Sequence, residues 1–224
     1  EFYRSLYNQM NNILLLKHAF RDADFNMHTL LGYVPRDRMT KLVEDDISNY
    51  GDFCWIDFEE EECLDAISDK ELAELLYLGH RKELWKAPFY QILQNRYVYL
   101  ANGDGWWNKV YYRNLLDFYR MLGETVAGKL SNTRLSKSFI GMKKRRLFPP
   151  VDVDVILQMK LKMKEGLLIA VSDASKTRNV VEVPLWIVGD FDHVDDMLGE
   201  YKRIAKGTPD GKLLFDRKTK EWKL

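Results

Sequence analysis

The sequence predicts an α+β protein in which antiparallel sheet segments pack with several amphipathic helices. Three observations predict this class. Several segments carry apolar residues at steps of three and four, which is typical of helices that pack on one face. Other segments are short aromatic or β-branched runs bounded by turn residues, which is typical of strands. The two kinds come in mixed order, without the regular strand–helix alternation of a parallel sheet.

Three helices are expected from spacing alone. Residues 2–20 place apolar side chains along one helical face. Residues 35–47 repeat the pattern more briefly, and Pro35 suits the first turn of a helix. Residues 114–130 return to the same spacing after an aromatic stretch. The chain should therefore contain helices both before and after its most aromatic region.

Two further helices carry signals at their ends. Ser68 and Glu71 have the spacing of a capping box, and Gly79 can end the helix that they begin. Residues 192–207 begin with acidic residues and end with basic ones, which suits the helix dipole, and Asp192 is expected as the N-cap.

Strands are expected where the pattern shortens. Residues 52–58 have the bulk and brevity of a buried strand. Residues 97–112 consist of two aromatic runs around the turn residues 102–105, which predicts a β-hairpin. Further strands are expected at 166–174 and 179–191, and a terminal hairpin at 211–224.

One stretch, residues 151–166, fits two structures. Its odd positions are apolar, as in a strand, but Asp152 and Asp154 lie at its start, lysines lie near its end and Gly166 follows. Because signals at both ends favour a helix, we expect a helix. Two residues apart on a helix is a rotation of about 200°, so Asp152 and Asp154 are not expected to share a metal ion.

The organisation along the chain suggests three parts, which can also belong to one domain. Residues 1–130 form a helix-rich part with the aromatic hairpin, residues 131–150 form a basic connecting segment, and residues 151–224 form a C-terminal α+β part. No internal repeat is evident.

Charge is strongly separated although 34 basic and 34 acidic residues cancel. Residues 44–65 hold ten acidic residues and no lysine or arginine, whereas residues 125–151 hold seven basic residues and no acidic one. Such tracts are typical of solvated faces or of segments that meet an oppositely charged partner. Here each tract is a candidate partner for the other, within one chain or between two copies.

Composition narrows the class of function. No apolar run approaches the roughly 18 residues that span a bilayer, so no membrane association is expected. Cys54 and Cys63 are interpreted as reduced thiols of a cytoplasmic protein. Common nucleotide-binding, zinc-protease and serine-hydrolase motifs are absent, so we expect no cofactor and do not favour an enzyme.

Two regions are candidates for an interaction surface, namely the aromatic hairpin 97–112 and the basic run that follows it. Exposed aromatic rings beside cations can stack on bases, although burial in a core sheet is the favoured interpretation. The four basic residues can contact phosphates. The candidate residues are Trp106, Trp107, Lys109, Arg113, Lys143, Lys144, Arg145 and Arg146.

A third candidate is acidic. Asp57, the run 59–62 and His80 offer oxygen and imidazole ligands for a divalent cation, but a solvated acidic face is the favoured interpretation.

The sequence therefore predicts a non-catalytic cytoplasmic protein that acts by protein contacts or by self-association as a homodimer. The alternative is a nucleic-acid-binding module that uses the basic run 143–146 and the hairpin 97–112. A metal-dependent hydrolase at residues 57–62 comes third.

Overall fold

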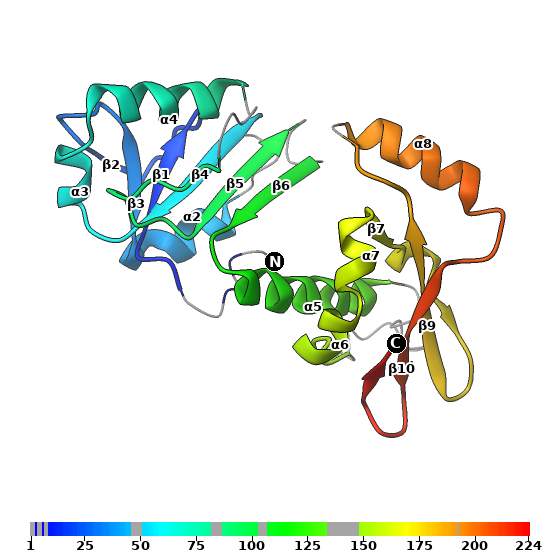
Figure 1. Cartoon of the computed structure of the whole chain (residues 1–224). Coiled ribbons are helices and arrows are strands. Elements are labelled where there is room, and N and C mark those ends of the chain that lie inside the picture. Colours follow the sequence, from blue (N-terminus) through cyan, green and yellow to red (C-terminus); the bar gives the residue numbers. More distant parts are fainter. Residues whose placement is uncertain are drawn as a thin grey trace. The chain divides into compact units, whose positions relative to one another are not determined.

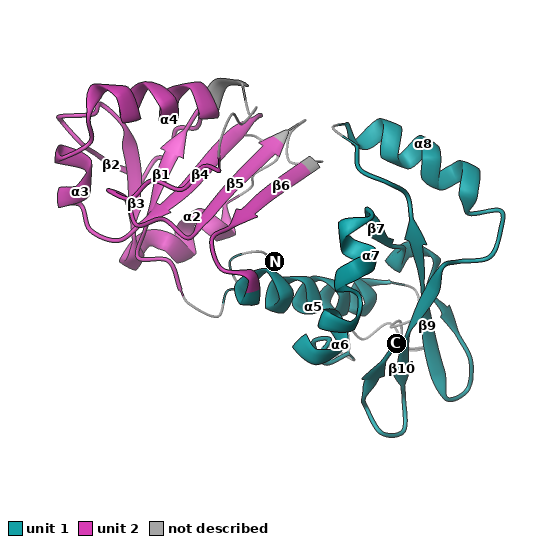
Figure 2. Cartoon of the chain, viewed as in Figure 1, with its two compact units in different colours: residues 1–7, 116–224 teal, residues 8–115 magenta. Residues whose placement is uncertain are grey.

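The computed structural model describes residues 3, 6, 9–45, 51–81, 87–102, 107–133, 148–191 and 193–224, with backbone only at 79–81, 102 and 107. Its antiparallel sheets and helices confirm the α+β class. The chain divides into two compact units, shown in Figure 2: residues 8–115, here called unit 2, and residues 1–7 with 116–224, called unit 1. Among the described residues, no helix combines the length and apolar character that a membrane crossing requires.

Unit 2 is built on a six-stranded antiparallel sheet with the order β2-β3-β1-β4-β5-β6 (Figure 1). Neighbours along the chain pair at both ends of this order, and β1 pairs with both β3 and β4. The strands are β1 (Asn12–Leu16), β2 (Asp24–Phe25), β3 (Gly32–Pro35), β4 (Phe53–Phe58), β5 (Tyr97–Asn102) and β6 (Trp107–Tyr112).

The helix predicted for residues 2–20 is wrong over β1. All five residues of β1 are buried, because this strand lies inside the sheet and is covered on both faces. A strand buried on both faces is a continuous apolar run, so it carries no alternation that would distinguish it from a helix. Ile13 aligns with Val34 on one side and with Asp57 on the other.

Four helices complete unit 2. They are η1 (Arg36–Arg38), α2 (Met39–Glu44), α3 (Glu62–Asp65) and α4 (Asp69–Arg81). The capping box is confirmed, because the Glu71 amide donates to Ser68 Oγ at 3.3 Å and the Ser68 amide donates to the Glu71 carboxylate at 3.1 Å. Gly79 does not end this helix, which continues to Arg81. Pro35 lies at the end of β3, so the helical pattern begins one residue later than predicted.

The predicted strand 52–58 and the hairpin 97–112 are confirmed. Tyr97 aligns with Tyr112 and Asn102 aligns with Trp107, while residues 103–106 of the turn lie outside the described residues. In β5, four of the six residues are buried, as the favoured interpretation of this stretch expected: Tyr97, Val98, Leu100 and Ala101.

Unit 1 packs helices on a second antiparallel sheet with the order β11-β10-β9-β7, to which β8 adds by pairing with β9. The helices are α5 (Leu115–Asn132), α6 (Val153–Gln158), α7 (Lys160–Lys164), η4 (Val171–Asp173) and α8 (Val194–Ile204). The strands are β7 (Leu167–Ile169), β8 (Ser175–Lys176), β9 (Val180–Ile187), β10 (Gly211–Asp216) and β11 (Trp222–Lys223).

The stretch 151–166 is helical, as expected, but it forms two short helices, α6 and α7, that meet at Met159. Val155, Ile156 and Met159 are buried in the core of unit 1 and hold this segment against the sheet. Asp152 occupies the N-cap position without a side-chain hydrogen bond to the helix, so its carboxylate does not act as the predicted cap. Gly166 follows the helices with φ +84°.

The remaining predictions for unit 1 hold with shorter bounds. The helix expected at 114–130 is α5, and the terminal hairpin is β10–β11. The strand expected at 166–174 is confirmed only for β7, because the chain turns into η4 after Ala170. The N-cap residue of α8 is His193, and the predicted cap, Asp192, lies outside the described residues.

Contacts divide the chain between Leu115 and Leu116, within the first turn of α5. The reason is packing, because Val126 and Leu130 of α5 share one core with Val183 and Leu213 of the second sheet. Most of the predicted connecting segment, 131–150, lies outside the described residues.

Candidate interaction surface

The loop between β2 and β3 exposes large apolar side chains. Phe25 is 56% exposed, Met27 79% and Leu30 65%. We call these three residues the loop surface. Monomeric proteins expose single apolar side chains routinely, but three within six residues on one loop form a candidate binding surface.

This loop is held in place by Asn26. The Asn26 side-chain oxygen accepts hydrogen bonds from the Thr29 amide and the Thr29 hydroxyl, each at 2.8 Å. The Asn26 side-chain nitrogen donates to the Asp65 carboxylate at 2.8 Å, which ties the loop to α3. Backbone bonds join Asn26 to Leu30 and to Leu31. The loop surface is therefore presented on a fixed backbone.

Leu30 also adopts a left-handed backbone conformation, with φ +58°. This conformation costs an L-residue with a bulky side chain roughly 1–2 kcal/mol. The Leu30 amide donates to the Asn26 carbonyl at 2.9 Å, and this bond holds the strained conformation. The strain keeps an apolar side chain, 65% exposed, at the tip of the loop.

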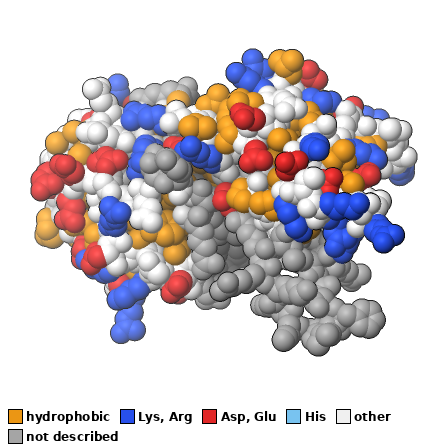
Figure 3. Space-filling model, turned by 90° about the horizontal axis from the view of Figure 1, so that it is seen from below, with side chains coloured by type: hydrophobic (Ala, Val, Ile, Leu, Met, Phe, Trp, Pro, Cys, Tyr) orange, Lys and Arg blue, Asp and Glu red, His pale blue; other side chains and the backbone are white. Residues whose placement is uncertain are grey.

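Beside this loop lies a group of exposed carboxylates at and just before α3. Asp65 accepts from Asn26, and Glu61 accepts from the Tyr33 hydroxyl at 2.8 Å. Figure 1 shows α3 and the β2–β3 loop at the same end of unit 2, and Figure 3 shows acidic and hydrophobic side chains together at that edge of the molecule. We call this set the acidic group; its members are Glu60, Glu61, Glu62 and Asp65.

The acidic group is not neutralised within the described part of the chain. Elsewhere in unit 2, Asp24 pairs with Arg38 and Asp22 pairs with Lys41 at 3.1 Å. No lysine or arginine among the described residues forms an ion pair with any member of the acidic group. This end of unit 2 therefore combines apolar side chains with excess negative charge.

The predicted metal ligands are not brought together. Asp57 is 3% exposed, and its Oδ1 accepts from the backbone amides of Arg96 at 2.9 Å and Tyr97 at 2.6 Å. Glu59 instead accepts from the Asn11 side chain at 2.6 Å. No group of three possible metal ligands gathers among the described residues, and the His80 side chain lies outside them. Asp57 fixes the start of β5 instead.

Burial raises the pKa of Asp57 to about 6, although the two amide hydrogen bonds and the Arg96 guanidinium act in the opposite direction. Arg96 Nε lies 3.6 Å from the second carboxylate oxygen. Asp57 thus titrates well above an ordinary aspartate, in a position where its hydrogen bonds are structural.

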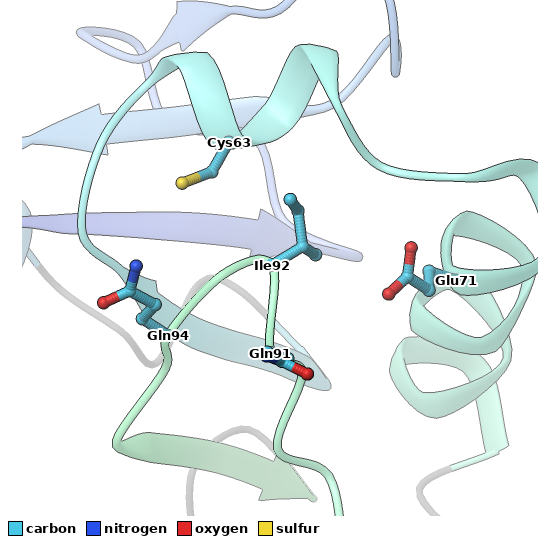
Figure 4. A pocket seen from close by; sticks show the side chains of 5 residues that line it. All are labelled: Cys63, Glu71, Gln91, Ile92 and Gln94. Atoms are coloured by element: carbon cyan, nitrogen blue, oxygen red, sulfur yellow. The ribbon is translucent and has the colours of Figure 1, made fainter.

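A shallow cavity of about 600 Å³ lies between α3, α4 and the turn at 91–94. Its lining residues are Cys63, Glu71, Gln91, Ile92 and Gln94. In Figure 4 the Cys63 thiol and the Gln94 amide lie on one side of Ile92 and the Glu71 carboxylate lies on the other.

The chemistry of this cavity is that of a polar contact site. Glu71 is engaged in the capping box through Ser68. No histidine or lysine is among the lining residues, so the Cys63 thiol has no base beside it in the cavity. A second cavity, of about 470 Å³, lies in unit 1 between the end of α5, the segment 168–172 and α8.

The predicted interaction residues are only partly described. Lys109 is exposed, with its ammonium 5.5 Å from the centre of the Tyr111 ring, and Arg113 is exposed, 5.8 Å from the centre of the Phe89 ring. Each cation thus lies over an aromatic ring of its own chain. Trp106, the Trp107 side chain, Lys143, Lys144, Arg145 and Arg146 lie outside the described residues.

The loop surface was missed from the sequence. Its residues show neither helical spacing nor alternation, and their exposure depends on the turn that Asn26 makes. The available signal was local: Phe25, Met27 and Leu30 are large apolar residues next to Asn26 and Gly32, which favour turns.

Comparisons with models of protein families, with curated proteins and with solved structures find no match to this chain. Its function is therefore argued from the surfaces and cavities described above.

Proposed function

We propose that the protein acts by binding another protein molecule through the loop surface, and that it does so without catalysis. The observation that carries the proposal is the exposure of Phe25, Met27 and Leu30 on a loop whose backbone is fixed by Asn26. A fixed apolar surface is what a partner can bury without first ordering the loop.

The energetics support a binding role. Full burial of one large apolar side chain contributes about 1.5–3 kcal/mol, so burial of the remaining exposed area of three such residues contributes several kcal/mol. Ordering a mobile loop would consume part of this free energy. Asn26 removes much of that cost, because its side chain already bonds to Thr29 and Asp65.

The alternative, nucleic-acid binding, remains a prediction from the sequence. It requires that residues 143–146 contact phosphates, so replacing all four with serine should weaken binding and its salt dependence, by roughly 0.9 in log–log slope for each lost contact on duplex DNA. Lys109 and Arg113 add little support, since both lie over aromatic rings of the chain.

The test is a co-purification from cells that contain the protein. The variant Met27→Ser with Leu30→Ser removes two exposed side chains and leaves Asn26 in place. The matched control, Leu76→Ser with Leu115→Ser, removes two other exposed leucines of unit 2, which are 51% and 53% exposed.

We expect a protein species, whether a second copy or another chain, that co-purifies with the wild type and the control but not with the loop variant. If every co-purifying species is retained by the loop variant, the loop surface is not the binding surface and the proposal is wrong.

A further inference from the structure

Unit 1 carries an exposed face that is apolar and basic. On α6 and α7, Leu157 is 41% exposed and Leu161 is 72% exposed, and both Lys160 and Lys164 are exposed. Steps of three and four along a helix place residues on one side, so these four residues form one stripe. We call it the α6–α7 face.

The α6–α7 face is held by buried residues beneath it. Val155, Ile156 and Met159 belong to the core of unit 1, and Lys162 Nζ donates to the Asp210 carbonyl at 2.7 Å. Lys160 and Lys164 form no ion pair with the described residues. Their charges are therefore available to a partner.

The two surfaces of this chain are complementary in character. The loop surface offers apolar side chains beside the uncompensated acidic group. The α6–α7 face offers apolar side chains beside uncompensated lysines. Contact between them would bury leucine, methionine and phenylalanine together and would bring lysine ammonium groups towards carboxylates. Such complementarity favours the correct pairing and speeds association.

We propose that the α6–α7 face of one copy binds the loop surface of a second copy. This inference rests on the proposed function, because it names the partner of the same loop surface. The contact joins two different surfaces, so each copy keeps one unused surface of each kind until the assembly closes. The assembly therefore grows beyond a dimer or closes into a ring. Both surfaces are small, so we expect affinity in the micromolar range or weaker.

Sedimentation over a wide protein concentration range, combined with exchange of charges, tests the inference. Glu60→Lys with Glu62→Lys reverses charge beside the loop surface and leaves Asp65 and its bond to Asn26 intact. Lys160→Glu with Lys164→Glu reverses charge on the α6–α7 face. A matched control, Lys202→Glu with Lys206→Glu, reverses two exposed lysines, one on α8 and one just after it.

We expect the wild type to gain mass with concentration, each reversed pair to weaken association at least tenfold, and the four-residue combination to restore it to within about threefold. High salt should weaken the wild-type contact, because exposed charges are screened. Leu161→Ser should weaken association with little effect on its salt dependence, which provides a second variant if Lys160→Glu and Lys164→Glu disturb the short helix.

A wild type that stays monomeric at every concentration would overturn the inference, as would reversed pairs that associate normally or a combination that fails to restore association while its circular dichroism stays native. None of these results would disprove the proposed function. That function fails only if no co-purifying species depends on Met27 and Leu30.

Discussion

The two units fix their sheets by different means. In unit 2 the start of β5 is held by a buried charge, since Asp57 accepts the amides of Arg96 and Tyr97. In unit 1 the start of β7 is held by close backbone approach, since a side chain at Gly166 would meet the Gly189 carbonyl oxygen at 1.9 Å. The first device responds to pH, and the second responds only to added volume. The stability of the two units should therefore depend on different variables.

The largest effect is expected for Asp57→Ala. This change leaves two buried backbone amides without an acceptor, and each costs about 1–3 kcal/mol. We expect unit 2 to lose about 4 kcal/mol of unfolding free energy. Hydrogen exchange of β4 and β5 amides, followed by mass spectrometry, should show faster exchange there and unchanged exchange in β9 and β10. Equal acceleration in both sheets would mean that the units do not unfold separately.

A somewhat smaller effect is expected for Gly166→Ala in unit 1. Gly166 has φ +84°, which strains any L-residue, and the added methyl group would contact the Gly189 backbone. Strain and overpacking together should destabilise unit 1 by about 3 kcal/mol. Denaturant unfolding followed by the exchange of β7 and β9 amides measures the loss, and the loss should be the same at pH 5 and pH 7. A loss confined to one of these pH values would contradict the steric account.

The comparison is sharpened by pH. The folded-state pKa of Asp57 is raised to about 6, above its unfolded value, so the folded protein binds this proton more tightly. Lowering the pH from 7 to 4.5 should therefore stabilise unit 2 through Asp57, by about 2 kcal/mol. Burial lowers the pKa of His18 to about 4, so this group acts oppositely and costs stability as pH falls below its unfolded value of 6.5.

Asp57→Asn separates the two groups, because it keeps an acceptor for both amides and removes the charge. Its stability relative to the wild type should be greater at pH 7 than at pH 4.5, as measured by the unfolding midpoint of unit 2. A constant difference across this range would show that Asp57 does not titrate with a raised pKa.

A still smaller effect is expected at the capping box of α4. Ser68→Ala removes the acceptor of the Glu71 amide and should cost about 1 kcal/mol. Ser68→Asp retains an acceptor at the cap and should restore most of the loss. An unchanged denaturation midpoint for Ser68→Ala would mean that this bond contributes nothing to unit 2.

Local signals explain which parts of the fold the sequence predicted. The capping box of α4 and the hairpin β5–β6 depend on residues close in the chain, and both were predicted correctly. β1 could not be distinguished from a helix, because its burial on both faces comes from β3 and β4, which follow later in the sequence. At 151–166 the signals at the ends outweighed the alternation, and the helices formed.

The candidate surface was less predictable than the fold. The acidic tract was evident, but its position beside an exposed apolar loop depends on the bond between Asn26 and Asp65, which are 39 residues apart. Likewise, the role of Asp57 depends on Arg96 and Tyr97. Composition indicates which residues are available, but only the folded chain shows which of them meet.

The most direct test of the central claim is photo-crosslinking from position 27. A photoreactive residue in place of Met27, which is 79% exposed, should leave the fold intact and crosslink to any molecule that covers the loop surface. We predict a crosslinked protein partner, with the attached peptide drawn from residues 157–164 of a second copy. A peptide from another protein would support the proposed function and contradict the self-association. If position 27 gives no more crosslinking than a photoreactive residue placed at Leu76, the loop surface binds no protein and the account is wrong.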